Sequence, residues 1–228
     1  MLTRLALATL LLLTALPSRS ESVWIGGVAG SGQTRVAYFG HVGPLPGKRL
    51  SDGWSQSLFV DRVTYEYQAG PNRIQGRSSG LKLGVMRQIQ LPLGSIGLGG
   101  GIAYQHTQLR PVDPGNDNQG GHVRAVTELH WMSRDDLPWK TQAFGQYVIG
   151  ARSYYANVFA GRKLANGVAI GPQFATNGDP SYRIYSAALA VNGIKFGGGT
   201  LGPYVGMQHV QGGDTKPEIG VSFVLYRP

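Results

Sequence analysis

The last segment of the chain, KPEIGVSFVLYRP at 216–228, alternates between two kinds of side chain. Small or mixed residues stand between four apolar residues that are two positions apart: Ile219, Val221, Phe223 and Leu225. Successive side chains of a strand point to opposite faces, so this pattern predicts a β-strand with one strongly apolar face. The fold must either cover that face with protein or place it in lipid.

Similar segments recur every ten to sixteen residues back to about residue 23, separated by connectors rich in Gly, Pro, Asn and Asp. The expected strands are 23–30, 34–42, 54–68, 73–90, 95–109, 122–132, 140–149, 153–162, 168–176, 182–191, 201–210 and 217–226. The segment at 95–109 is rich in Gly on one face. Such a face indicates a place where space is needed, as in a curved barrel wall or a crowded lumen. An even number of strands brings both chain ends to one side.

These strands predict an all-β fold, an antiparallel transmembrane β-barrel of about 12 strands. A closed barrel satisfies every backbone hydrogen bond in lipid, whereas an open sheet does not. The alternative is ten strands, with the first two short segments forming an N-terminal extension. A soluble β-sandwich or a lipocalin-like barrel would also alternate, but the Gly-rich faces, the 14% charged residues and the long strands favour the membrane barrel.

The barrel prediction makes the last strand the closing strand. We expect 217–226 to pair with 23–30, and its four alternating apolar residues to face lipid. Three polar connectors, Arg110–Gly121, Asn177–Ser181 and Gln211–Thr215, then fall together on the outer side. The first of these is the longest polar interruption, and its Pro, Gly, Asn and Asp residues predict an exposed loop.

The N-terminus has the layout of a secretory signal: Arg4, an apolar run over 5–13, a break at Pro17 and then small residues. The run is too short for a spanning helix. We therefore expect a cleaved signal peptide at 1–20 and one outer-membrane β-barrel domain at 21–228. There is no Cys in the chain, so an exported protein of this sequence depends on hydrogen bonds and packing for its stability.

The formal net charge is +9, or about +7 without Arg4 and Arg19. Basic residues are scattered singly along the strands, which suits lipopolysaccharide, acidic glycans or paired charges in a lumen better than nucleic acid. We expect no nucleic-acid partner and an outer-membrane location.

Six charged residues lie inside predicted strands, on their more polar faces. Because charge on a lipid face is costly, we expect them to line the lumen, to pair with one another, and to be the candidates for polysaccharide contact. They are Arg62, Glu66, Lys82, Arg124, Glu128 and Arg183. Nine tyrosines are expected to form an aromatic girdle at the membrane interfaces rather than platforms for sugars. They are Tyr65, Tyr67, Tyr104, Tyr147, Tyr154, Tyr155, Tyr182, Tyr185 and Tyr204.

The sequence shows no catalytic constellation. Its five histidines are dispersed, and none adjoins a Ser in a recognisable motif. Asp113, Asp117 and His122 could suggest a cation site, but DPGNDNQGG lacks the regular oxygen spacing of a Ca²⁺ loop, and a solvated turn is the better interpretation. We expect no catalytic residue, no metal site and no cofactor.

Four segments make the chain resemble the cellulose biosynthesis protein BcsS family of proteobacterial outer-membrane proteins. They are LSDGWSQSLFVDRVTYEYQAGPNRIQGR at 50–77, RPVDPGNDNQGGHV at 110–123, AIGPQFATNGDPSYRIYSAALAV at 169–191, and the closing GVSFVLYRP. The resemblance implies an outer-membrane or export-associated component of cellulose synthesis without a catalytic site. One departure concerns the end of the chain, because outer-membrane barrels often end in an aromatic residue and this chain ends Tyr226-Arg227-Pro228.

The function that follows is a non-enzymatic outer-membrane accessory protein in the biosynthesis and secretion of bacterial cellulose or a related exopolysaccharide. Its expected partners are outer-membrane lipid, lipopolysaccharide, the glycan and the cellulose synthase and export machinery. Two alternatives stay open: a small outer-membrane porin, and an outer-membrane enzyme that modifies lipid A or a glycan.

Overall fold

The computed structural model describes residues 22–50 and 53–227, and most of them belong to β-strands. The predicted signal peptide at 1–20 lies outside the described residues. Within the two described ranges, no helix has the length and apolar character needed to cross a bilayer. The strands are β1 (Ser22–Ser31), β2 (Thr34–Pro44), β3 (Gly53–Ala69), β4 (Asn72–Leu91), β5 (Gly94–Arg110), β6 (Gly120–Ser133), β7 (Trp139–Val148), β8 (Ser153–Lys163), β9 (Ala169–Asp179), β10 (Tyr182–Asn192), β11 (Ile194–Phe196), β12 (Gly199–Val210) and β13 (Thr215–Arg227).

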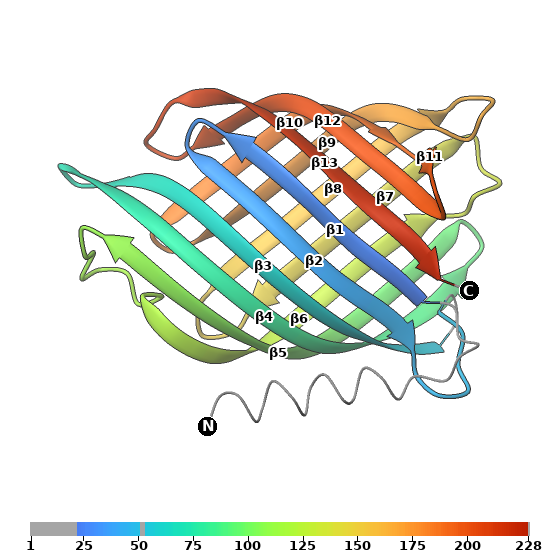
Figure 1. The fold of residues 1–228 in the computed structure, drawn as a ribbon, viewed down its shortest axis with the longest axis horizontal. Helices are drawn as coiled ribbons and strands as arrows, with labels where there is room; N and C mark the ends of the chain where they lie inside the picture. Colours follow the sequence, from blue (N-terminus) through green and yellow to red (C-terminus); the bar gives the residue numbers. More distant parts are fainter. Residues whose placement is uncertain (1–21, 51–52, 228) are drawn as a thin grey trace.

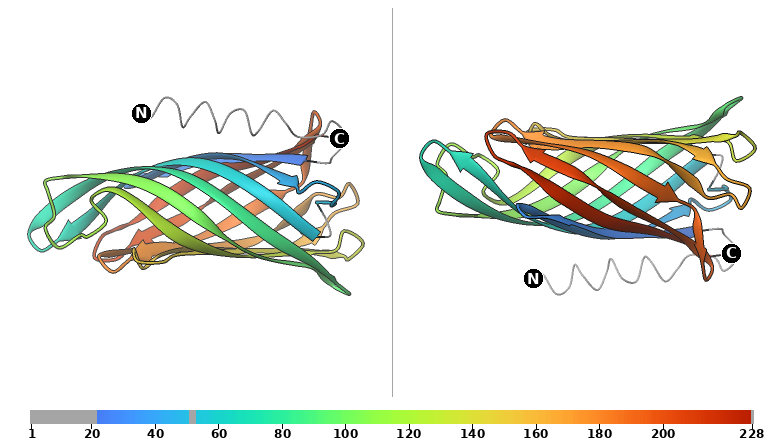
Figure 2. Two further views of the ribbon diagram at one scale, coloured as in Figure 1. Left: turned by 90° about the horizontal axis from the view of Figure 1, so that it is seen from below. Right: turned by 90° about the horizontal axis from the view of Figure 1, so that it is seen from above.

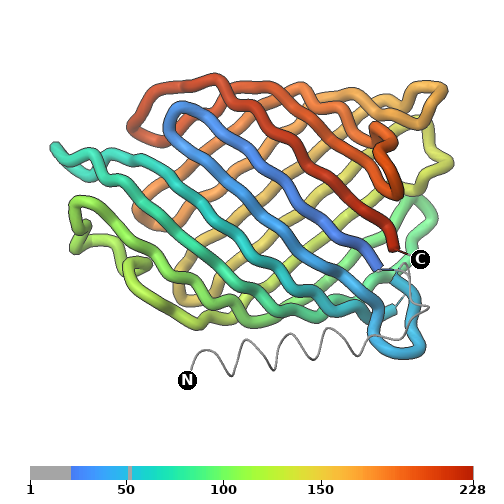
Figure 3. Tube along the Cα trace, in the orientation of Figure 1, coloured from blue at the N-terminus to red at the C-terminus, as the bar shows by residue number. Residues whose placement is uncertain are grey.

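Twelve of these strands close into one antiparallel barrel (Figures 1 and 3). Each strand pairs with its neighbour in the chain, β1 also pairs with β13, and β10 also pairs with β12. The three-residue strand β11 pairs only with the start of β12 and forms a short arm on the rim. The predicted barrel of about 12 strands is confirmed, and the ten-strand alternative is wrong because β1 and β2 are part of the wall.

The first and last strands pair as predicted. Gly26, Val28 and Gly30 of β1 lie directly opposite Phe223, Val221 and Ile219 of β13. Ile219 is 69% exposed, and the positions two apart from it share its outward face. Phe223 is half-buried rather than fully exposed, because its ring lies against the wall over Gly26, which has no side chain.

Both described chain ends lie at the same end of the barrel, here called the terminal end (Figure 1). The opposite end, called the distal end, carries the turns β1–β2, β3–β4, β5–β6, β7–β8, β9–β10 and β12–β13. The three polar connectors expected to share one side therefore do so. The longest of them is the loop at 111–119 between β5 and β6.

The wall is uneven in height. Strand β4 has 20 residues and its neighbours β3 and β5 have 17 each, whereas β8, β9 and β10 have 11 each. At about 3.3 Å per residue, β4 is roughly 66 Å long and β8 roughly 36 Å. Barrel strands tilt by about 35–45°, so the β3–β5 side stands roughly 50 Å tall, about twice the height of the roughly 25 Å apolar band of a membrane barrel. Seen edge-on, the barrel is flattened (Figure 2).

Several glycines stand directly opposite an aromatic residue of the next strand, and the ring covers the glycine. A Cβ added at Gly76 would lie 2.3 Å from Cζ of Tyr65, and one added at Gly220 would lie 2.4 Å from Cζ of Tyr204. The same arrangement holds for Gly26 with Phe223, Gly27 with Tyr38, and Gly40 with Phe59. Glycine is required at these positions because the ring occupies the space that a side chain would fill.

Candidate functional site in the barrel lumen

A stack of three tyrosines crosses the lumen near the distal end. Tyr65 of β3 and Tyr182 of β10 have ring centroids 4.9 Å apart, and Tyr67 lies 5.9 Å from Tyr182. In the closed sheet, β3 and β10 are separated by β2, β1, β13 and β12. The contact therefore joins nearly opposite walls of the barrel.

Aliphatic side chains fill the space around this stack. Tyr65 and Tyr67 belong to one buried cluster that draws on both walls, and neither ring is more than 6% exposed. The aliphatic members are Ile74, Leu109, Ile184 and Val210. The inward faces of an open channel would meet water, whereas here they form a small apolar core. The lumen is packed shut at this level.

The loop at 111–119 folds back onto the tyrosine stack. The Tyr67 hydroxyl donates to Oδ2 of Asp113 at 2.6 Å and accepts from Nδ2 of Asn116 at 3.2 Å. Asn116 is only 4% exposed. The expectation of an exposed loop is wrong at Asn116, because this side chain satisfies its hydrogen bonds inside the barrel mouth.

Two further hydrogen bonds tie the loop to the lumen wall. Arg124 of β6 donates from Nη1 to Oδ1 of Asn118 at 2.7 Å, and Nδ2 of Asn118 donates to Oδ2 of Asp179 at 2.7 Å. Asp179 ends β9, so these contacts link β6 through the loop to β9, past the intervening strands β7 and β8. The three tyrosines and the loop together are called the distal cap below.

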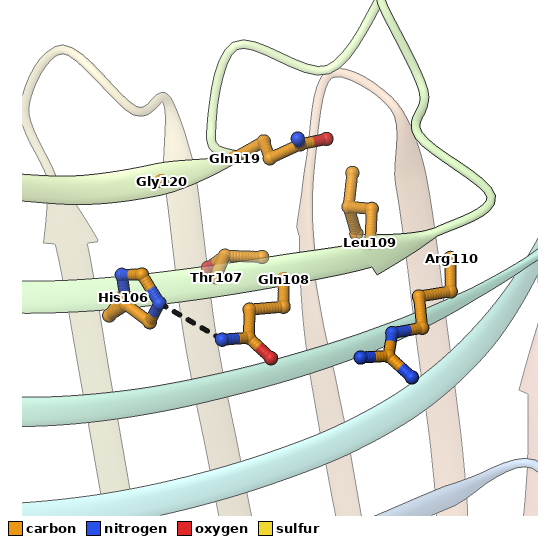
Figure 4. Close-up of a pocket in the computed structure, with 7 residues that line it drawn as sticks. All are labelled: His106, Thr107, Gln108, Leu109, Arg110, Gln119 and Gly120. Atoms are coloured by element: carbon orange, nitrogen blue, oxygen red, sulfur yellow. Dashed lines mark hydrogen bonds between the residues drawn. The ribbon is translucent and has the colours of Figure 1, made fainter.

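A pocket of about 320 Å³ opens beside the distal cap (Figure 4). Pairing between β5 and β6 ends at Thr107 and Gly120, whereas β5 stays paired to β4 as far as Arg110. The last residues of β5 therefore have no strand partner on the loop side. His106, Gln108 and Arg110 contribute to the lining, with Nε2 of Gln108 3.3 Å from Nε2 of His106. This pocket offers polar groups to a ligand at the rim.

A second cluster occupies the middle of the lumen, centred on a buried ion pair. Lys82 of β4 donates from Nζ to Oε1 of Glu128 on β6, and also to Oε1 of Gln146 on β7 at 2.9 Å. The Lys82 and Glu128 side chains are 12% and 5% exposed. The ammonium group also lies 4.8 Å from the ring centroid of Phe59 and 5.7 Å from that of Phe144. These contacts give the buried charge both an acid and two aromatic faces.

The six charged residues selected from the sequence divide between the two faces of the wall. Lys82, Arg124 and Glu128 point into the lumen, and they share that face with buried neighbours such as Ser78 and Val126. The other three lie on the outer surface. Arg62 is on the face of Val60, which is 45% exposed, and Arg183 is on the face of Leu189, which is 56% exposed.

Glu66 accompanies Arg62 on the outer face of β3 and forms an ion pair with Arg73. The ladders on both sides of β3 continue through Asp61 without a bulge, so the alternation of faces is not interrupted. The expected pairing of charges in the lumen therefore holds for Lys82 with Glu128, whereas Arg62, Glu66 and Arg183 lie on the outer surface of the barrel.

The predicted tyrosine girdle is partly wrong. Tyr104, Tyr147 and Tyr185 are between 43% and 46% exposed and lie on the outer surface. Four members lie in the lumen instead, and all four cover glycines or each other: Tyr65, Tyr67, Tyr182 and Tyr204. Tyr155 also faces the lumen, where its ring meets Phe144 at 5.6 Å. Sequence reasoning missed the distal cap, although the coincidence of aromatic and glycine positions on facing strands was a usable signal.

Among the described residues, no histidine, acid and nucleophile are assembled into a hydrolytic site. Each described histidine has its own unrelated contact, such as His122 with the backbone oxygen of Gln119 and His209 with the hydroxyl of Thr215. His130 is the one near a carboxylate, 4.0 Å from Glu128, but that acid already holds Lys82. Over residues 22–50 and 53–227, no three His, Asp or Glu side chains gather as metal ligands do.

Comparisons with known proteins agree with this geometry. A family model described as cellulose biosynthesis protein BcsS matches residues 23–225. The solved structure titled KdgM porin is similar with a TM-score of 0.51 at 10% identity, covering 88% of this chain and 98% of that one. KdgM porin in complex with disordered oligogalacturonate gives 0.50 at 11% identity over the same shares. The β domain of the Bordetella autotransporter BrkA gives 0.47 at 10% identity, covering 90% and 99%. No curated protein matches the chain.

Proposed function

The chain belongs to the cellulose biosynthesis protein BcsS family, and from this premise we propose that it is a non-enzymatic outer-membrane accessory protein of cellulose or related exopolysaccharide production and secretion. The barrel fold and its outer-membrane neighbours support the location. The distal cap is the observation that favours an accessory role over a conduit for the polymer. A glucan chain threading the lumen would have to displace the tyrosine stack and the loop that is hydrogen-bonded above it.

The proposal includes an orientation. With the chain ends in the periplasm, the distal cap faces the outside and the β3–β5 wall rises beyond the membrane there. Outer-membrane barrels have short periplasmic turns and longer external loops, which supports placing the loop at 111–119 outside. The rim pocket beside it, with His106, Gln108 and Arg110, is then the polar surface available to the emerging polymer.

A non-enzymatic role is supported by the lumen chemistry. The buried acid of the central cluster is neutralised by Lys82, and it is not free to act as a general acid or base. Polysaccharide contact by Arg62, Glu66, Lys82, Arg124, Glu128 or Arg183 remains part of the proposal. Of these, Arg124 lies in the lumen beneath the loop, which it holds through Asn118.

Deletion of the gene tests the cellulose assignment. Cellulose is measured by dye binding and by release of glucose on glucanase digestion, in the deletion strain and in the strain complemented with the wild-type chain. We expect reduced or mislocalised polymer after deletion and recovery on complementation. Polymer that is unchanged in amount and location would refute the assignment.

Opening the distal cap separates the accessory role from a conduit or a porin. The double variant Tyr65→Ala and Tyr182→Ala removes both rings of the closest cross-lumen contact. Tyr185→Ala is the matched control, because Tyr185 lies on the outer face of β10. In planar bilayers we expect no steady current from the wild type or the control, and an added current from the double variant. Complementation of cellulose production should survive in the control, and steady wild-type conductance would favour the porin.

A further inference from the structure

Three arginines on the outer wall surround one position of β3. Thr64 pairs with Arg35 of β2 on one side and with Arg77 of β4 on the other. Strands lie about 4.8 Å apart, so the two arginine positions are roughly 10 Å from each other, and Arg62 is about 7 Å along β3 from Thr64. All three arginines are exposed. Arg35, Arg62 and Arg77 are called the arginine triangle.

The arginine triangle has no acidic partner. Among residues 22–50 and 53–227, no ion pair involves any of its three members. The nearby acid on the same face, Glu66, is held by Arg73 and accepts a hydrogen bond from Gln75. Asp61 lies on the opposite, inward face, where its carboxylate covers Gly80. The outer wall therefore presents three unneutralised guanidinium groups close together.

The triangle lies at the edge of the apolar band. One pairing row towards the terminal end from Arg62, the outward residues of β2, β3 and β4 are Phe39, Val60 and Leu81. These are between 38% and 45% exposed. An arginine costs about 2–4 kcal/mol at the bilayer midplane but about 0–1 kcal/mol near an interface. The outward residues thus change from apolar at Val60 to basic at Arg62, which places the triangle at the headgroup level of one leaflet.

A groove in the wall begins at the same place. It has a volume of about 480 Å³ and runs over β13, β1, β2 and β3, with Arg62 in its lining. Its outward apolar lining is Val28, Ala37, Phe39, Val60, Val221 and Phe223. Ala37, which pairs with Arg62, leaves the floor low between larger neighbours. The groove is a hydrophobic channel that ends at a cationic group.

We propose that the arginine triangle and the groove form a binding site for one phosphorylated lipid of the outer leaflet, the lipid A part of lipopolysaccharide. An acyl chain would lie in the groove, and the guanidinium groups would donate paired hydrogen bonds to phosphate oxygens. Charge complementarity selects this occupant, since the site offers three cations and the one acid among the lining residues of the groove, Asp61, belongs to the inward face. The choice of the outer leaflet rests on the orientation proposed above, with the distal end outside, whereas the site does not depend on the cellulose assignment.

The test measures lipid bound to the folded full-length mature chain in neutral detergent micelles, by native mass spectrometry. The probes are diphosphorylated lipid A, the same lipid without its phosphates, and phosphatidylglycerol. The triple variant R35Q/R62Q/R77Q removes the triangle. The matched control R87Q/R162Q/R183Q removes the same charge from outward positions elsewhere on the wall. Heat-modifiable migration in gels verifies that each variant is folded.

We expect one diphosphorylated lipid A per wild-type and control barrel, with at least tenfold weaker binding to the triangle variant and to the phosphate-free lipid. A37W fills the groove but keeps all three charges, and it should weaken lipid A binding while leaving the fold intact. Phosphatidylglycerol should bind weakly and equally to all variants. Equal binding of lipid A to wild type and triangle variant, or equal binding of lipid A and phosphatidylglycerol to the wild type, would overturn the proposal.

Discussion

The buried ion pair in the lumen gives a quantitative test of how much the link between β4 and β6 contributes to stability. Lys82→Met removes the cation that contacts Glu128 and leaves a carboxylate with a side chain only 5% exposed. The next cation, His130, is 4.0 Å away and is charged only if protonated. Removal of one partner of a buried pair typically costs about 3–5 kcal/mol, so we expect a loss of unfolding free energy in that range.

The reverse change should cost less. In Glu128→Gln, Lys82 keeps its hydrogen bond to Gln146 at 2.9 Å and its contacts with the rings of Phe59 and Phe144. We expect a loss of about 2–3 kcal/mol. The double variant removes both charges of the pair, but the inward carboxylate of Asp61 still loses the nearby cation of Lys82, so its loss should be smaller than that of Lys82→Met alone.

Reversible urea unfolding in phospholipid vesicles, followed by tryptophan fluorescence, measures the three differences. The double-mutant cycle then gives the coupling energy, which we expect to exceed about 2 kcal/mol. Additive effects, or single variants that each lose less than about 1 kcal/mol, would refute the buried pair as a structural link between β4 and β6.

Three further outcomes are expected. Gly76→Val should lower the unfolding free energy by about 1–3 kcal/mol through overpacking against the ring of Tyr65. Gly145→Ala, whose Cβ would lie 4.0 Å from Cβ of Leu129, should be close to neutral in the same urea assay. Tyr67→Phe removes the hydroxyl that bonds both loop side chains, and limited proteolysis should cut the loop at 111–119 faster without change in barrel migration. Val28→Cys with Val221→Cys should form a disulfide under mild oxidation because these positions are paired, and failure to cross-link would contradict the closure of β1 on β13.

Strand alternation located the barrel and its closing seam because most outward faces are apolar without ambiguity. In β4, outward Leu81, Leu83 and Val85 alternate with inward Gly80, Lys82 and Gly84, so the face of Lys82 could be predicted from the sequence. The even strand number and the shared end of the polar connectors followed from the same periodicity.

Strand β3 shows where that reasoning fails. Its inward face carries Val63, Tyr65 and Tyr67, which are as apolar as a lipid face because the distal cap packs the lumen shut there. Its outward face carries Arg62 and Glu66 because this part of the wall lies beyond the apolar band. Polarity within one strand cannot distinguish the two environments, since a closed lumen reverses the usual contrast. The distal cap itself depends on contacts between β3 and β10, which are far apart in the sequence.

The glycine and aromatic pairs bear on how the barrel finds its alignment during assembly. A slip of β3 by two residues against β4 would keep every side chain on its proper face, so the apolar pattern alone would not oppose it. The slip would, however, bring the Tyr65 ring against Ile74 or Ser78 instead of Gly76. Each ring thus fits over one glycine of the neighbouring strand. The pairs spaced around the wall therefore penalise any strand register in which a ring meets a larger side chain.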